Sequence, residues 1–315
     1  MPIQTELHRH LDISLRLTTL FRLVKERSIV PDSMTLEQFR EKIILTKPLT
    51  DLAAVIETFS IFQQIYDKAE VLETVSYEVV EDCWNEGTRK AELRFSPSFI
   101  SRVSGMSWDL ALASIQKGVA RALAKYPGMK VGLICIATRE FSPEVGKTVD
   151  FFLNNEKSFV GFDLAGNEAN FPSRHFKDTF KPLRDRGSRI TVHAGEAAGP
   201  ENVWESIELL GAQRIGHGIA SIQDAKLMDF LAKHSICLET CPTSNWLTQC
   251  VPTLEAHPLP RLLRAGVPVS LNTDDPGVFA ITLPSEMEVC RRQMGMTEAE
   301  IQACMAHADR ASFIV

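Results

Sequence analysis

The chain has 315 residues, of which 44% are hydrophobic and 23% charged, enough for one large α/β domain or two smaller ones. Its net charge of −6 excludes a broad basic surface, so we expect no nucleic-acid partner. The chain start lacks the basic and apolar regions of a signal peptide, and no apolar run is long enough to cross a membrane. We therefore expect a cytoplasmic protein without membrane contact.

Apolar, β-branched segments alternate with amphipathic helical patterns along the chain. This alternation predicts parallel βαβ units, and eight of them predict a (β/α)8 TIM barrel as one domain of residues 1–315. A doubly wound sheet would more often have fewer strands and a Gly-rich first turn. The predicted strands are 5–10, 90–95, 130–138, 159–164, 189–193, 214–217, 236–240 and 267–271, and the clearest helices are 108–125, 200–210, 224–233 and 259–265.

The connection between the first two strands, residues 11–89, is too long for a simple crossover and predicts a helical insertion. After a first helix and a polar loop at 31–35, it has helical patterns at 36–45, 51–66 and 69–86. An apolar face formed by Val55, Ile56, Phe59 and Phe62 is either a lid over the active site or a surface that packs on the barrel exterior. The pattern alone leaves both interpretations open.

Metal-binding and proton-transfer residue types follow several predicted strands. His8 and His10 are two apart, so on a strand they point to the same face while Arg9 points to the other. His193 ends another strand, and the following Ala-Gly allows a tight turn before Glu196. Two inward histidines at one strand end are hard to explain by packing and favour a metal site.

Two further segments end at the same predicted rim. His217 lies between two glycines, and Asp274 and Asp275 follow the last strand. Alone, each could be a structural histidine on a rigid turn or a pair of turn and helix-cap residues. Together with the other segments they predict a site of three imidazoles and a carboxylate, which suits zinc. With Glu196 to transfer protons and His217 to orient water, this site is typical of a hydrolase.

The cysteines, the other histidines and the short motifs of the chain indicate no other site. The seven cysteines lack C-x-x-C pairs and suggest free, buried thiols in a reducing compartment. A thiolate ligand from Cys237 or Cys241 is the less favoured alternative. We find no phosphate-binding loop, dinucleotide fingerprint, G-x-S-x-G motif or H-x-E/P-C-x-x-C deaminase signature. Surface or structural roles are expected for the other histidines, His175, His234, His257 and His307.

At these positions the chain closely resembles the adenosine deaminase family of metal-dependent (β/α)8 hydrolases. The matching segments occur in family order along almost the whole chain, at residues 6–12, 92–97, 163–168, 191–197, 214–218, 241–245 and 270–276. The resemblance implies one zinc ion per chain and a helical lid that contains Val55, Ile56, Phe59 and Phe62. The implied zinc ligands are His8, His10, His193 and Asp274.

The resemblance also implies a role for each catalytic residue. Glu196 protonates purine N1, while His217 and Asp274 position the attacking hydroxide at C6. The implied substrate contacts are His10, Asp12 near a ribose hydroxyl, Gly166 at N3 and Asp275 at N7. The expected reaction is deamination of adenosine and 2′-deoxyadenosine in purine salvage, with a small-molecule nucleoside as substrate and no obligatory protein partner.

Two departures from the family bear on substrate choice and length. Ile13-Ser14 stands where the family usually has glycine after His-Leu-Asp, which leaves the preference at the ribose 5′ position open. The chain also ends earlier than the family's last helix leads us to expect. The alternatives are a deaminase of adenine, a 5′-modified adenosine or aminodeoxyfutalosine, a metal-dependent ester or amide hydrolase, or an inactive ligand-binding homologue.

Overall fold

Eight parallel strands form the centre of the computed structural model, which describes residues 4–315. The strands follow one another in chain order around the sheet. The His10 N–H donates to the Asp274 carbonyl and the Asp274 N–H to the His8 carbonyl, both at 2.9 Å, and these bonds join the segment just past the last strand to the first strand. The strands are β1 Gln4–His10, β2 Thr88–Phe95, β3 Lys130–Thr138, β4 Gly161–Ala165, β5 Ile190–Ala194, β6 Arg214–His217, β7 Cys237–Thr240 and β8 Val269–Leu271.

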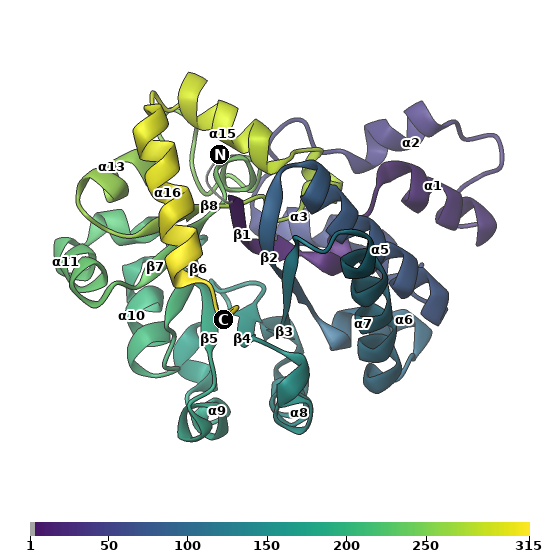
Figure 1. The fold of residues 1–315 in the computed structure, drawn as a ribbon, viewed down its shortest axis with the longest axis horizontal. Coiled ribbons are helices and arrows are strands. Elements are labelled where there is room, and N and C mark those ends of the chain that lie inside the picture. Colours follow the sequence, from purple (N-terminus) through teal and green to yellow (C-terminus); the bar gives the residue numbers. More distant parts are fainter. Residues whose placement is uncertain (1–3) are drawn as a thin grey trace.

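Helices surround the strands, and α1 and α2 extend away from the barrel (Figure 1). The predicted TIM barrel is therefore confirmed. The helices are α1 Leu17–Glu26, α2 Leu36–Ile43, α3 Leu52–Thr58, α4 Ser60–Gln63, α5 Ala69–Asn85, α6 Pro97–Ser104, α7 Trp108–Lys125, α8 Ser142–Asn154, α9 Lys181–Arg186, α10 Pro200–Glu208, α11 Ala225–His234, α12 Pro242–Leu247, α13 Leu259–Arg264, α14 Pro276–Phe279, α15 Leu283–Arg292 and α16 Glu298–Ala311. No helix of residues 4–315 is both long and apolar enough to span a membrane.

Several element boundaries differ from the predicted ones for local reasons. The last strand begins at Val269, because Pro268 precedes it and has no N–H to donate to a neighbouring strand. Asp224 is the N-cap of α11, where its side chain accepts hydrogen bonds from two backbone N–H groups. The pattern at 51–66 forms two short helices, because Phe59 ends α3 with a tighter bond to the Ile56 carbonyl at 3.1 Å.

The insertion is attached to the rim of the barrel at several points. Backbone N–H groups of Leu45 and Leu49 donate to carbonyls of Val278 and Leu247, at 2.9 and 3.1 Å. The buried Tyr66 hydroxyl donates to the carbonyl of Asp12 at 2.6 Å. These bonds hold α3 and α4 over the carboxyl ends of the strands.

Candidate active site

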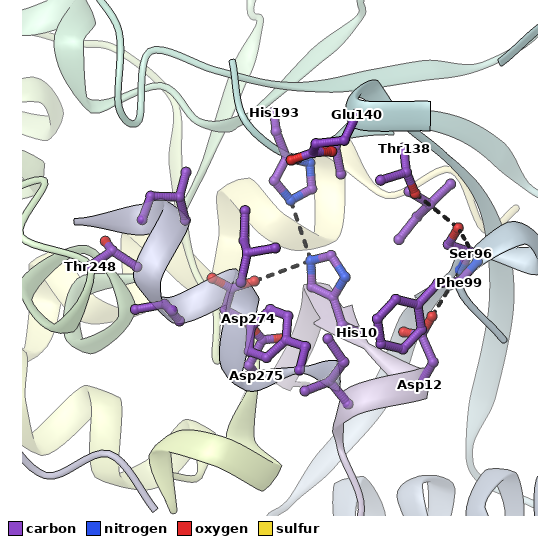
Figure 2. A pocket seen from close by; sticks show the side chains of 18 of the residues that line it. His10, Asp12, Ser96, Phe99, Thr138, Glu140, His193, Thr248, Asp274 and Asp275 are labelled. Carbon is purple, nitrogen blue, oxygen red and sulfur yellow. Dashed lines mark hydrogen bonds and ion pairs between the residues drawn. The ribbon is translucent and has the colours of Figure 1, made fainter. Parts of the chain in front are cut away.

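A cavity of about 430 Å³ opens at the carboxyl ends of the barrel strands. This is the end at which TIM-barrel enzymes place their active sites. In Figure 2, His10 lies between His193 and Asp274, while Asp12 and Thr138 lie on the opposite side of the cavity from Thr248. Residues at or just past seven of the eight strands contribute to the lining, namely His10, Ser96, Thr138, Ala165, His193, His217 and Asp274.

Four of the predicted residues form a compact group of possible metal ligands. One donor atom from each of His8, His10, His193 and Asp274 lies within 4.8 Å of every other. Both His8 Nε2 and His10 Nε2 are 3.2 Å from Asp274 Oδ1, and His10 Nε2 is 3.3 Å from His193 Nε2. Buried His8 Nε2 has no hydrogen-bond partner. Three ring nitrogens and one carboxylate oxygen fit a zinc ion, which keeps a further position for water when it is catalytic.

Buried carboxylates orient two of these rings from behind. His8 Nδ1 is 2.8 Å from Glu239, and His193 Nδ1 is 3.1 Å from Asp163. Because a carboxylate accepts at Nδ1, each ring carries a proton there and directs its Nε2 towards the cluster. Arg94 bridges the two carboxylates, at 2.7 Å from Asp163 and 2.6 Å from Glu239. Burial opposes ionisation, yet the charges of Arg94 and its neighbours hold the pKa values of both carboxylates below their usual range.

Glu196 is held in place through its own backbone. The carboxylate of Glu168 accepts hydrogen bonds from four successive N–H groups at residues 195–198, at 2.6 to 3.0 Å. Burial, with the nearby charges of Asp274 and Glu168, raises the pKa of Glu196 well above its usual range. A carboxyl group that keeps its proton near neutral pH can act as a general acid.

His217 converges with Glu196 and Asp274. Its Nε2 lies 3.5 Å from Glu196 Oε2 and 3.8 Å from Asp274 Oδ2. His217 and Asp274 both have left-handed backbones, with φ of 59° and 63°. This conformation is uncommon for residues other than glycine, and here it occurs at two residues that converge on the same site. Burial lowers the pKa of His217 well below its usual range, so the ring is neutral.

The predicted substrate-contacting residues also line the cavity. Asp12 Oδ2 accepts from the Ser96 N–H at 2.9 Å, while its Oδ1 and that of Asp275 are buried without a hydrogen-bond partner. Burial raises the pKa of Asp12 to about 7, and burial with the charge of Asp274 raises the pKa of Asp275 well above its usual range. Gly166 has a φ of 103°, which favours glycine. Unpaired carboxyl oxygens of this kind are suited to bind polar groups of a ligand.

The insertion supplies an apolar wall of the same cavity. Val55, Ile56 and Phe59 of the predicted apolar face line it. Phe62, on α4, belongs to the buried core and is not among the lining residues. Ile13 is also a lining residue.

Several residues near the site were not assigned a role from the sequence. Glu168 and Asn245 lie in segments that match the family, so their signal was present although no role followed from it. Asp163 also lies in a matching segment, whereas Glu239 does not, and both act behind the ligands. Glu140 lines the cavity and accepts from the Asn167 N–H at 2.6 Å, and no sequence signal pointed to it.

The thiolate alternative has a geometric basis at Cys241, which lies with His217 and Asp274 in a second possible ligand group. Burial raises the pKa of the Cys241 thiol well above its usual range. Its thiol is directed to the Glu239 carbonyl at 3.6 Å. A protonated thiol bonded to the backbone is a poor metal ligand, so the group of three histidines and Asp274 is the better candidate.

A family model described as adenosine deaminase matches residues 3–315. The chain belongs to the adenosine deaminase family. The adenosine deaminase of Yersinia enterocolitica is 38% identical over 314 residues, which cover 98% of this chain and 93% of that protein. Membership of the adenosine deaminase family makes the protein a hydrolytic deaminase.

Solved structures of adenosine deaminase relatives include enzymes with other adenine substrates. The adenine deaminase of Arthrobacter aurescens has a TM-score of 0.90 and 25% identity, and the match covers 100% of this chain and 95% of that one. The N6-methyl-AMP deaminase of Arabidopsis thaliana has a TM-score of 0.83 and 26% identity, over 99% of this chain and 92% of that one. The shared fold therefore serves a base, a nucleoside and a nucleotide.

Proposed function

We propose that this deaminase converts adenosine and 2′-deoxyadenosine to inosine and 2′-deoxyinosine with release of ammonia, in cytoplasmic purine salvage. The observation that carries the proposal is a buried carboxyl group with a raised pKa, Glu196, beside His217 and the metal-ligand group in one cavity. Protonation of purine N1 by Glu196 draws electron density from the ring. C6 thereby becomes more electrophilic, which is what attack by water requires.

One zinc ion per chain would be held by His8, His10, His193 and Asp274. When bound, zinc activates water for nucleophilic attack at neutral pH. Asp274 and His217 orient the water with their side chains, which converge on the same region. Burial opposes ionisation of Asp274, yet the neighbouring His8 and His10 hold its pKa well below its usual range, so it is a charged acceptor.

The other residues would bind the purine and the sugar. Asp275, with its raised pKa, can donate a proton in a hydrogen bond to N7. The backbone N–H of Gly166 would donate a hydrogen bond to N3, and Asp12 would accept one from a ribose hydroxyl. His10 would contact the substrate as well as the metal. Because Ser96 satisfies only one oxygen of Asp12, the other remains available to the sugar.

A nucleoside fits the charge of the cavity better than a nucleotide does. Among the described residues that line it, none is a lysine or arginine, while the carboxyl groups are those of Asp12, Glu57, Glu140, Glu196, Asp274 and Asp275. A phosphate would lack a cationic partner and meet carboxylates instead. The alternatives that remain are adenine, a 5′-modified adenosine and aminodeoxyfutalosine. A hydrolase for esters or amides is less favoured, because Asp275 would have no evident role in it.

We also propose that residues 1–315 form a single deaminase domain in which the insertion at 11–89 carries a lid. The support is the position of α3, whose residues Val55, Ile56 and Phe59 line the cavity. An apolar cover excludes water from the bound purine and strengthens the electrostatic interactions inside the site. Ile13 would limit the space on the sugar side.

Ultraviolet assays with a panel of substrates test the proposal. Adenosine and 2′-deoxyadenosine should have the highest kcat/KM, above adenine, AMP and 5′-modified adenosines, in protein that contains one zinc ion per chain. Asp12→Asn should raise KM for adenosine and leave that for adenine almost unchanged. Turnover of adenine or of a 5′-modified adenosine at a kcat/KM tenfold above that of adenosine would overturn the choice of substrate.

A further inference from the structure

A chain of buried hydrogen bonds connects the backbone of α13 to His217. It runs from the Leu259 N–H through His257 and Asn245, whose exposed fractions are 2% and 0%. Neither His257 nor Asn245 lines the cavity. His257 was expected to be a surface or structural histidine, and it is a buried residue with both ring nitrogens engaged. Because one end of this chain is a backbone donor, the direction of every bond can be worked out.

The first bond determines the state of His257. The Leu259 N–H can only donate, and it lies 3.1 Å from His257 Nδ1. His257 Nδ1 must therefore be the unprotonated acceptor, and the proton of the ring is on Nε2. His257 Nε2 then donates to Asn245 Oδ1 at 3.1 Å. Burial, which lowers the pKa of His257 to about 3, agrees with a neutral ring.

The hydrogen bond from Asn245 determines which ring nitrogen of His217 carries the proton. With its oxygen facing His257, the Asn245 amide presents its NH2 group to His217 Nδ1 at 3.1 Å and to Glu196 Oε1 at 3.4 Å. An amide NH2 group only donates, so His217 Nδ1 accepts and carries no proton. The proton of His217 is consequently on Nε2, the atom that faces Glu196 and Asp274.

We propose that Asn245 and His257 are positioning residues that fix His217 as the Nε2–H tautomer. This inference rests on the proposed function, because it concerns the same site. His217 then offers a hydrogen-bond donor, and not a lone pair, to the oxygen of the attacking water. A proton released by that water cannot pass to Nε2, so it must go to a carboxylate. The same amide also occupies Glu196 Oε1 and leaves Oε2 for the proton that is given to the purine.

Nitrogen-15 NMR of histidine-labelled, zinc-loaded protein tests the tautomer directly, with His217→Asn to assign the signals. The wild-type ring should show a protonated Nε2 and an unprotonated Nδ1. In Asn245→Asp the carboxylate cannot donate, so the proton should move to Nδ1. We expect kcat to fall roughly 10- to 100-fold, with zinc content unchanged, as for other residues behind an active site. The matched control is Gln249→Glu, an exposed amide-to-carboxylate change just after α12, which should leave both measurements unchanged.

Two variants of His257 separate positioning from packing. Gln at this position can accept from the Leu259 N–H and donate to Asn245, so His257→Gln should retain kcat within a few-fold. His257→Phe fills the space without either bond and should lose as much kcat as Asn245→Asp. A protonated Nδ1 in the wild type, or equal activity of the two His257 variants at matched melting temperature, would overturn the proposal. If the tautomer changes as expected in a protein that turns over no adenine compound, the proposed function fails and this inference stands.

Discussion

At the scale of single residues, the site contains both an ionised carboxyl group and carboxyl groups that keep a proton. His8 and His10 keep Asp274 ionised, while burial keeps a proton on Glu196 and on Asp275. Carboxyl groups whose environments push their pKa values apart are able to divide the roles of acid and base between them. This division follows from position in the barrel, because Asp274 lies 3.2 Å from both His8 and His10 and the other two carboxyl groups do not.

Glu196→Gln should lower kcat by about 100-fold or more, since the amide cannot supply the proton that general acid catalysis requires. Zinc content should not change, because Glu196 is outside the group of metal ligands. Initial rates of adenosine deamination and metal analysis of the same preparation provide the two measurements. An unaltered kcat would refute the role of Glu196 as the acid.

Gly166→Ala should impair the enzyme more than it impairs folding. A Cβ atom at Gly166 would overlap the Glu140 carboxylate, and the φ of 103° is itself unfavourable for alanine. We expect kcat/KM for adenosine to fall at least tenfold through displacement of the N3 contact. Gly105→Ala is the control, because its φ of 67° is also left-handed and nothing lies within 4 Å of the added atom. Equal activity of both variants would argue against a substrate contact at Gly166.

The sequence predicted the catalytic and metal-binding residues better than the residues that orient them. The spacing of His8 and His10 places both rings on one face of β1, and the structure brings them to Asp274. The position of Glu140 in the cavity and the chain of hydrogen bonds through His257 were not predictable, because each depends on contacts between segments distant in sequence. The sequence around a loop histidine such as His257 does not show which side-chain amide it contacts.

At the scale of elements, the strand ends supply ligands and the loops supply orientation. The loop after β5 is held by the single carboxylate of Glu168, which satisfies four backbone donors that would otherwise be unpaired. Helix α7 and strands β3 and β6 have the boundaries that their patterns predict. The α3–α4 break was missed, since it depends on how the insertion fits the barrel rim and not on local periodicity.

Phe59→Ala should raise KM for adenosine roughly tenfold, since loss of an apolar contact of about 1.5 kcal/mol weakens binding by that factor. The melting temperature should change little, because Phe59 is only half-buried. Val103→Ala on α6 is the control, as its side chain is 59% exposed and lies outside the cavity. A lower melting temperature with unaltered KM would show that α3 only packs on the barrel and is not a lid.

At the scale of the whole molecule, the barrel interior contains charge as well as apolar packing. Arg94 and Arg214 both contact Glu239, at 2.6 and 2.7 Å, and Arg214 also contacts Glu92 at 2.6 Å. All four side chains are almost completely buried. Removing one partner would leave an uncompensated charge, which is strongly destabilising. This ion-pair network supports the carboxylate behind His8 and so links the stability of the fold to the orientation of the ligands.

Glu286 provides a test of how buried acids affect stability. It accepts from the N–H and hydroxyl of Thr243, and burial raises its pKa to about 7 despite these bonds. Because the folded-state pKa is above the value of 4.5 in the unfolded chain, the stabilisation is full below pH 4.5 and is lost as pH rises towards 7. Glu286→Gln imitates the protonated acid. In this variant the free energy of unfolding should fall less steeply between pH 5 and 7 than in the wild type. The two slopes should differ by up to about 1.4 kcal/mol per pH unit. Parallel urea titrations of both proteins measure this, and identical slopes would contradict the raised pKa.

A crystal structure of the zinc-loaded protein with a bound purine nucleoside tests the central claim most directly. The proposed function predicts N1 within hydrogen-bond distance of Glu196, N7 facing Asp275, N3 at the Gly166 N–H and a sugar hydroxyl at Asp12. Zinc should be bound by the three histidines and Asp274. A nucleoside bound with its six-membered ring away from Glu196, or a metal bound elsewhere in the barrel, would contradict the assignment of this site as an adenosine deaminase centre.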